Sequence, residues 1–170
     1  MTLFRVGFLL AMIATPCLAQ TGSVTFYSEE MTAKDTLKAT VMPAGIVPFF
    51  GWIYDGPQRL AREDAGRFVT FRLPVGLHTF SATTSRKHPG KATIALNLQT
   101  GEHACLRLRM SYVNPAPVVL PVAWVTSKIE EVPCDQATKE AAKTKPLESK
   151  RVDAPVRAEV DASPAFPGGS

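Results

Sequence analysis

The sequence predicts an all-β fold: an antiparallel β-sandwich of about seven strands, followed by a short helix and a disordered tail. Short stretches of alternating apolar and polar residues, such as 94–98, recur with turn residues between them. No convincing helical spacing of apolar residues interrupts these stretches. The last residues combine proline with charge and contain few large apolar side chains. These observations favour a sandwich or barrel over an α+β domain.

The composition fits one folded domain. The chain has 170 residues, of which 45% are hydrophobic and 20% are charged, and its mean hydropathy is +0.03. These values argue against disorder of the whole chain, and the length argues against two full-sized domains. Three cysteines are too few for a disulfide-dense miniprotein and lack the spacing of a zinc cluster. A net charge of +4 does not by itself imply nucleic-acid binding.

The first 19 residues have the three-part pattern of a secretory signal peptide. Arg5 precedes an apolar run over 6–14, Pro16 breaks that run, and small residues lead to a cleavage point after Ala19. The run is shorter than the roughly 20 residues that a transmembrane helix needs. Cys17 follows a proline rather than a small residue, so a lipid anchor is not expected. We therefore expect an exported chain, periplasmic or secreted, with no transmembrane span in its mature form.

The strands expected in the first half of the mature chain are separated by turn signals. Val24 and Phe26 share one face of the first strand, as period-2 alternation requires. Asp55–Gly56 is a strong turn signal after an aromatic-rich stretch, and 74–76 turns the chain again. The predicted strands of this half cover 23–28, a weaker candidate at 37–41, 49–54, 66–73 and 77–83.

Residues 94–98 and 105–112 show the cleanest alternation in the chain. Thr100–Gly101 lies between them as a two-residue turn, so we predict that they form an antiparallel hairpin. A final extended stretch covers 118–132 and contains Pro121, which indicates an edge strand or a bulge.

The end of the chain is expected to differ from the sandwich. Residues 135–143 are the one helix candidate. Residues 144–170 hold balanced charges, prolines and few large apolar side chains, so they are predicted to be disordered. The predicted organisation is a signal peptide at 1–19, a β-sandwich domain with a short helical extension at 20–143, and a tail at 144–170.

Cys105 and Cys134 form an even pair once the signal peptide is removed. In an oxidising compartment such a pair predicts a disulfide, the alternative being two buried free thiols. The alternation places Cys105 on the face of Arg107 and Arg109, away from the apolar face that carries Leu106. The bridge is therefore expected at the periphery, tying the C-terminal extension across the outside of the sheet.

No group of residues indicates a reaction. We expect His78 to be a hydrogen-bonded structural residue that points inward or lies at the sheet rim. His88 is expected to be solvated in a loop, and His103 follows the predicted turn. Because the three histidines lie on separate elements, no metal or other cofactor is expected. No serine lies in a Gly-x-Ser-x-Gly elbow, and no glycine-rich loop could hold a phosphate. Adjacent carboxylates such as Glu63–Asp64 point to opposite faces of a strand and are expected to be solvated.

Three aromatic residues, Trp52, Tyr54 and Trp124, are candidates for a ligand or partner surface. Two apolar segments with several prolines are 41–50 and 115–124. They either pack against each other as a core layer or covered edge, or form an exposed partner or membrane-proximal patch. Basic residues are expected to lie on a solvated outer face with a weak attraction to anionic envelope polymers, and nucleic acid is not an expected partner of an exported protein. These basic residues are Arg59, Arg62, Arg67, Arg86, Lys87, Arg107 and Arg109.

Residues 73–82 match the pattern Leu-Pro-x-Gly-x-His-x-x-x-Ala. This pattern resembles one found in small exported bacterial β-sandwich modules with an immunoglobulin-like or prealbumin-like fold, and is similar to the domain-of-unknown-function family 2846. The resemblance covers about residues 22–140 in element order. The segment 42–50, the cysteine pair and the tail depart from the family pattern. The resemblance implies no catalytic residues, and His78 at the matching position is expected to be structural.

From these features we expect a non-enzymatic exported module. It would bind or brace an envelope or extracellular component, either a protein or a glycan. The alternative is a small-ligand or carbohydrate-binding module that uses the aromatic residues Trp52, Tyr54 and Trp124.

Overall fold

The computed structural model describes residues 20–29, 50–113, 124–153, 155–156, 160 and 166. The predicted signal peptide, the strand candidate at 37–41 and nearly all of the two apolar segments lie outside the described residues.

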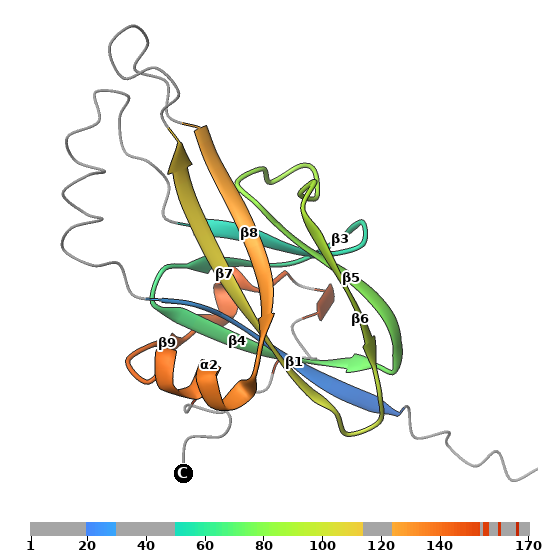
Figure 1. Cartoon of the computed structure of the whole chain (residues 1–170). Coiled ribbons are helices and arrows are strands. Elements are labelled where there is room, and N and C mark those ends of the chain that lie inside the picture. Colours follow the sequence, from blue (N-terminus) through green and yellow to red (C-terminus); the bar gives the residue numbers. More distant parts are fainter. Residues whose placement is uncertain are drawn as a thin grey trace, which may run out of the picture.

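Two β-sheets face each other and enclose the core (Figure 1), which confirms the predicted all-β sandwich. The larger sheet has the strand order β8-β7-β1-β4-β9, and the smaller sheet has the order β3-β2-β5-β6. The described residues contain nine strands rather than seven, because β3 and the short β9 were not predicted. The strands are β1 (Thr21–Ser28), β2 (Phe50–Asp55), β3 (Gln58–Asp64), β4 (Arg67–Pro74), β5 (Gly76–Thr83), β6 (Thr93–Leu98), β7 (His103–Val113), β8 (Trp124–Val132) and β9 (Lys145–Pro146).

The larger sheet is mixed rather than purely antiparallel. Its central strand β1 pairs antiparallel with β4 and parallel with β7. Strand β9 also pairs parallel with β4. Both faces of β1 are buried: Val24 and Phe26 lie in the main core, while Thr25 and Tyr27 are covered on the other side.

The predicted hairpin of 94–98 and 105–112 is wrong. The chain does turn at Thr100–Gly101, where Gly101 has φ +73° and its N–H donates to the Thr21 carbonyl. However, β6 pairs with β5 in the smaller sheet, while β7 pairs with β1 and β8 in the larger one. The apolar faces of β6 and β7 meet across the core instead of lying side by side. Alternation identifies a buried face but not the neighbouring strand.

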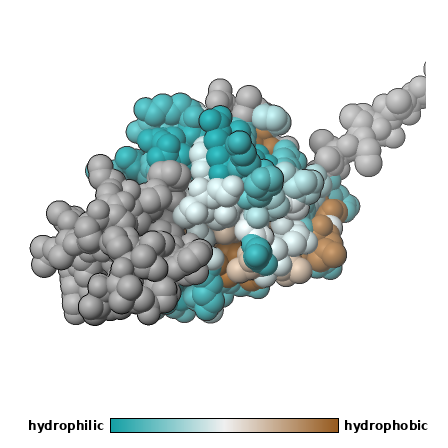
Figure 2. All heavy atoms as spheres, turned by 90° about the horizontal axis from the view of Figure 1, so that it is seen from above, coloured by the Kyte–Doolittle hydropathy of each residue, from teal (hydrophilic) through white to brown (hydrophobic). Residues whose placement is uncertain are grey.

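The main core joins residues of both sheets. Phe26 of β1 lies edge-on against Phe71 of β4 and Phe80 of β5, with ring centroids 6.0 and 5.2 Å apart. Such edge-to-face pairs add to the stabilisation from buried apolar area. Among the described residues, the large hydrophobic side chains exposed by more than a third are Val75 and Leu77, beside the turn between β4 and β5. Among the residues coloured in Figure 2, hydrophilic and intermediate ones cover most of this face, with smaller hydrophobic areas.

The prediction that residues 144–170 are disordered is wrong for the described part of that segment. Strand β9 pairs with Arg67–Phe68 of β4, and a short 3₁₀ turn follows at Ser149–Arg151. Val152 and Val156 are buried in the main core, and Phe166 is buried against Tyr27 and Phe68. A few well-spaced apolar residues cover the sheets, and the average composition of the segment hides them.

The predicted helix is present as α2 (Cys134–Glu140), which lies beside the larger sheet (Figure 1). Ala137 and Ala141 pack with Val132 and Phe166 in a second hydrophobic cluster on the outside of that sheet. In the described part of the chain, no helix is long and apolar enough to cross a membrane.

Candidate functional site

Trp52 lies on the outer face of the smaller sheet, and three guanidinium groups surround its ring. The guanidinium carbons of Arg59, Arg86 and Arg62 lie 4.9, 5.8 and 6.0 Å from the ring centroid. Cations at this distance are attracted by the negative face of the aromatic ring. We call Trp52 with these three arginines the Trp52 face.

A β-bulge between β2 and β3 creates this cluster. Trp52 pairs with Arg62 and Ile53 with Ala61, but Tyr54 pairs with Arg59, so Leu60 is an extra residue in β3. Leu60 and Ala61 are both buried in the core, while the arginines on either side of them lie on the outer face. In a regular strand, residues three positions apart point to opposite faces. The bulge therefore brings two arginines to one ring.

Two of the three arginines have carboxylate partners. Arg59 forms a two-pronged ion pair with Asp153, and Arg62 lies 3.5 Å from an oxygen of Asp64. The hydrogen bond to Asp153 raises the pKa of Arg59 although burial opposes it. Arg86 is exposed, and no carboxylate within the described ranges pairs with it. The Trp52 face therefore carries more positive than negative charge, which suits carboxylate or phosphate groups.

Tyr54 differs from the expectation of an exposed aromatic residue, because it is only 3% exposed. Its hydroxyl donates to the carbonyl of Arg86 at 2.6 Å and lies 3.3 Å from that of Ser85. Burial raises the pKa of this phenol. Tyr54 therefore holds the loop that carries Arg86. Trp52 is partly buried, and Trp124 begins β8 with a side chain outside the described part of the structure.

His78 is structural, as predicted, and lies at the rim of the smaller sheet. Its Nδ1 is 2.6 Å from Asp55 and its Nε2 is 2.9 Å from the Pro74 carbonyl oxygen. Its ring stacks on Phe80 with centroids 5.6 Å apart. Burial opposes the charged ring, but the bonds to Asp55 and Pro74 outweigh it, so the pKa of His78 is raised. Both ring nitrogens face acceptors, which fits a doubly protonated imidazolium.

Arg107 is buried at 7% exposure, although a solvated outer face was expected there. Its guanidinium lies 2.8 Å from Glu140 of α2, 3.0 Å from Glu130 of β8 and 3.6 Å from Glu29. Tyr27 donates a further hydrogen bond to Glu140 at 2.5 Å. Burial opposes charge on Glu140, but these bonds outweigh it and hold the pKa of Glu140 below its ordinary value. The network attaches the end of α2 to the larger sheet.

Cys105 and Cys134 form the predicted disulfide, with Cα atoms 5.3 Å apart. The bridge lies on the outer face of the larger sheet, as expected. It is not at the periphery, because Cys105 is 1% exposed and packs within the second hydrophobic cluster. The disulfide attaches the start of α2 to β7, while Glu140 attaches its end.

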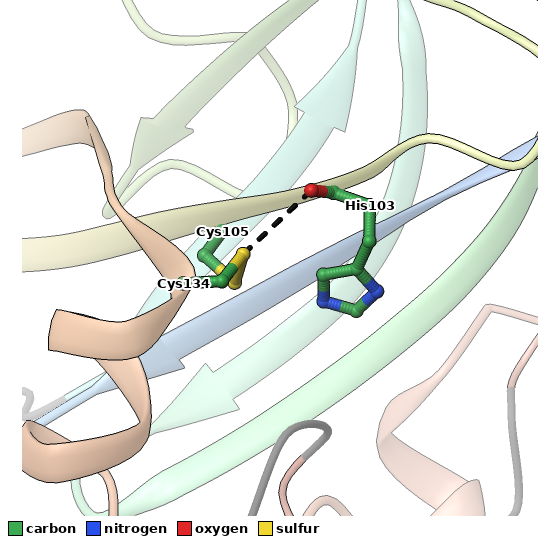
Figure 3. A group of neighbouring side chains, drawn as sticks. All are labelled: His103, Cys105 and Cys134. Carbon is green, nitrogen blue, oxygen red and sulfur yellow. Dashed lines mark hydrogen bonds between the residues drawn. A yellow bond between two sulfur atoms is a disulfide. The ribbon is translucent and has the colours of Figure 1, made fainter.

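His103 lies beside this disulfide (Figure 3), with its ring nitrogen and both sulfurs within 4.8 Å of one another. Its Nδ1 is 2.8 Å from the Ser23 hydroxyl, and its Nε2 is 3.2 Å from that of Thr25. Burial lowers the pKa of His103 and favours its neutral form. Sulfurs bonded to each other lack the thiolate charge that a zinc site requires. With the disulfide formed, the cluster of His103, Cys105 and Cys134 supports the packing of the larger sheet.

The sequence did not reveal the Trp52 face, because its arginines are scattered over 59–86 and the bulge leaves no clear signal. No family model, curated protein or solved structure matches this chain. The fold and the site together define a two-sheet β-sandwich module with an aromatic and basic outer face.

Proposed function

We propose that this protein is an exported, non-enzymatic β-sandwich module that binds an anionic envelope or extracellular component through the Trp52 face. The observation that carries the proposal is the clustering of three guanidinium groups within 6.0 Å of the Trp52 ring centroid. Guanidinium groups bind carboxylates and phosphates through paired hydrogen bonds. Arg86 is the exposed member that would make first contact with such a group.

The face is preorganised for this role. Tyr54 and Arg59 both donate to the Arg86 carbonyl, at 2.6 and 3.3 Å, so the loop is held over the sheet before any ligand arrives. A ligand that meets a preformed site loses less affinity to ordering of the protein. Its attraction would be screened by salt, since the Debye length falls from about 10 Å at 0.1 M to about 3 Å at 1 M.

Calorimetric titration with polygalacturonate, a carboxylate polymer, and with neutral dextran tests this proposal. We expect the protein to bind polygalacturonate, several-fold more weakly in Arg86→Gln and at high salt, and not to bind dextran. Lys139→Gln is the matched control, because it also removes one exposed positive charge but lies on α2, outside the other sheet. Equal losses in the two variants, or no binding to the acidic polymer, would contradict the proposal.

A neutral carbohydrate is the second candidate ligand, supported by the partly exposed ring of Trp52 on a sheet face. In that case, binding to a neutral glycan would disappear in Trp52→Ala and persist in Arg86→Gln. Loss of binding in both variants would instead support the anionic ligand, because both then act on the same charged cluster.

Export, the absence of catalysis and the resemblance to the domain-of-unknown-function family 2846 are parts of the same proposal. Mass spectrometry of the protein recovered from its native host would test export. A mature N-terminus at Gln20, directly after the predicted cleavage point, is the expected result. A retained residue 1 in the native protein would contradict it.

A further inference from the structure

Glu63 is a buried acidic side chain in the smaller sheet. It lies in β3 at 2% exposure, and neither carboxyl oxygen has a hydrogen-bond partner among the residues that the structure describes. Its neighbours Arg62 and Asp64 point outward, whereas Glu63 points into the sandwich. The expectation that this acid is solvated is therefore wrong. A buried carboxyl without a partner is costly and points to a missing interaction.

Gly51 lies opposite Glu63 in the antiparallel pair of β2 and β3. A Cβ atom built on Gly51 would meet no heavy atom within 4 Å, so the carboxyl has open space beside it. This space belongs to a cavity with an empty volume of about 240 Å³, part of which is open solvent. The cavity has room for about one water-sized group.

The cavity has apolar walls and a small polar group of side chains. Gly51, Ala82 and Leu108 form apolar lining, while Glu63, Ser28 and Ser127 bring oxygens. The Ser127 hydroxyl is buried and has no hydrogen-bond partner within the described part of the chain. The Ser28 hydroxyl donates to the Asp64 carbonyl at 3.0 Å, so its own oxygen can still accept. One carboxyl and two hydroxyls therefore offer three acceptors around a water-sized space.

Among the described residues, no cation pairs with Glu63 in the cavity. Arg109 of β7 also lines the cavity, but its guanidinium lies 3.5 Å from Glu29. Asp64 is adjacent in sequence and adds negative charge. Burial raises the pKa of Glu63 well above its ordinary value, and the Asp64 charge raises it further, although Ser28 opposes the shift. Burial therefore favours the neutral, protonated form of Glu63 when no cation is present.

We infer that this cavity binds a primary alkylammonium group, with Glu63 as its counter-ion. An ammonium group is about the size of a water molecule and has three N–H donors for the three acceptors, while the apolar walls suit its methylene stem. On binding, the Glu63 carboxyl gives its proton to solvent and becomes the carboxylate that pairs with the cation, so one proton is released for each ammonium bound. The shared chemistry fits a lysine side chain or a small free amine.

Isothermal titration with Nα-acetyl-lysine methylamide and with pentylamine tests the site and separates these two sources. Measurements in phosphate and in HEPES, whose ionisation enthalpies differ, report the number of protons released. We expect saturable binding of at least one amine, accompanied by proton release. Pentanol, the neutral analogue, should not bind.

Two variants decide whether Glu63 and its cavity are responsible. Glu63→Gln keeps the shape of the side chain and should weaken amine binding at least about tenfold. Gly51→Ala places a methyl group in the open space and should also weaken binding. Circular dichroism should show an intact fold in both variants. Unchanged affinity in either variant, or no binding at high millimolar amine, would overturn the inference. Arg86→Gln should leave amine binding unchanged. The amine site and the anionic-ligand proposal can therefore be contradicted independently of each other.

Discussion

Arg59 and Arg62 lie on the same outer face of β3, although they are three positions apart in the chain. The extra residue between them, Leu60, turns into the core together with Ala61. A single bulge thus builds a cluster of positive charge around Trp52 and places one more apolar side chain in the sandwich. Binding surface and core packing are produced by the same irregularity.

The first prediction concerns Tyr54, which holds the loop of the Trp52 face. Tyr54→Phe keeps the ring in the core and removes only the hydrogen bonds to the Ser85 and Arg86 carbonyls. We expect polygalacturonate binding to weaken two- to five-fold, by about 0.5–1 kcal/mol, because Arg86 is no longer held in place. The titration described above measures it. An unchanged affinity would mean that the loop is positioned by other contacts.

The second prediction concerns the disulfide. Cys105 and Cys134 close a loop of 29 residues in the sequence. In the chain-entropy model, opening such a loop costs about 3.5 kcal/mol of unfolding free energy. Urea denaturation of Cys105→Ala/Cys134→Ala should show this loss.

The same measurement has an internal control for the disulfide. A thiol reductant should destabilise the wild-type protein and have no effect on the double variant. If the reductant leaves the wild-type unfolding curve unchanged, the bridge either does not form or contributes nothing to stability.

The third prediction concerns the pH dependence contributed by His78. Because the pKa of His78 is raised above its ordinary 6.5 in the folded state, its contribution is complete below 6.5 and is lost as pH rises through the folded pKa. Asp55→Asn removes the carboxylate partner of His78, so the free energy of unfolding should change less as pH rises above 6.5. Denaturation at several pH values, with an NMR titration of His78, measures both. In a His78→Gln background, Asp55→Asn should no longer change the pH dependence, and a remaining change would contradict this account.

The fourth prediction concerns Arg107, the buried cation between the larger sheet and α2. Arg107→Met removes the cation beside Glu140 and one of the two cations beside Glu130 and Glu29, and should cost about 2 kcal/mol of unfolding free energy. This loss of unfolding free energy is smaller than for a fully buried ion pair, because the partly exposed carboxylates can be hydrated in the variant. Lys128→Ala is the control: its ammonium also contacts Glu130 but is 69% exposed, so the expected cost is about 0–1 kcal/mol. Equal costs would show that burial of Arg107 is unimportant.

Much of the fold could be predicted because strand alternation is a local property. The strands around Phe26 and Leu96, the helix after Cys134 and the pairing of the two cysteines followed from spacing and composition. Strand β3 was missed because its bulge at Leu60 interrupts the alternation. The buried positions of Val152 and Phe166 were missed because isolated apolar residues in a polar segment carry no periodic signal.

Spacing and composition were enough to identify which strand faces are apolar, where the chain turns and which cysteines are available to pair. Which strands are neighbours depends on tertiary contacts, since β6 and β7 are joined by a tight turn yet belong to different sheets. Tertiary contacts also set the environment of each charge. Arg107 is paired within a network, whereas Glu63 is buried without a hydrogen-bond partner in the described ranges. This difference arises because the alternation of side chains along a strand is set by local backbone geometry. The burial and protonation state of a side chain depend on residues that are distant in the chain.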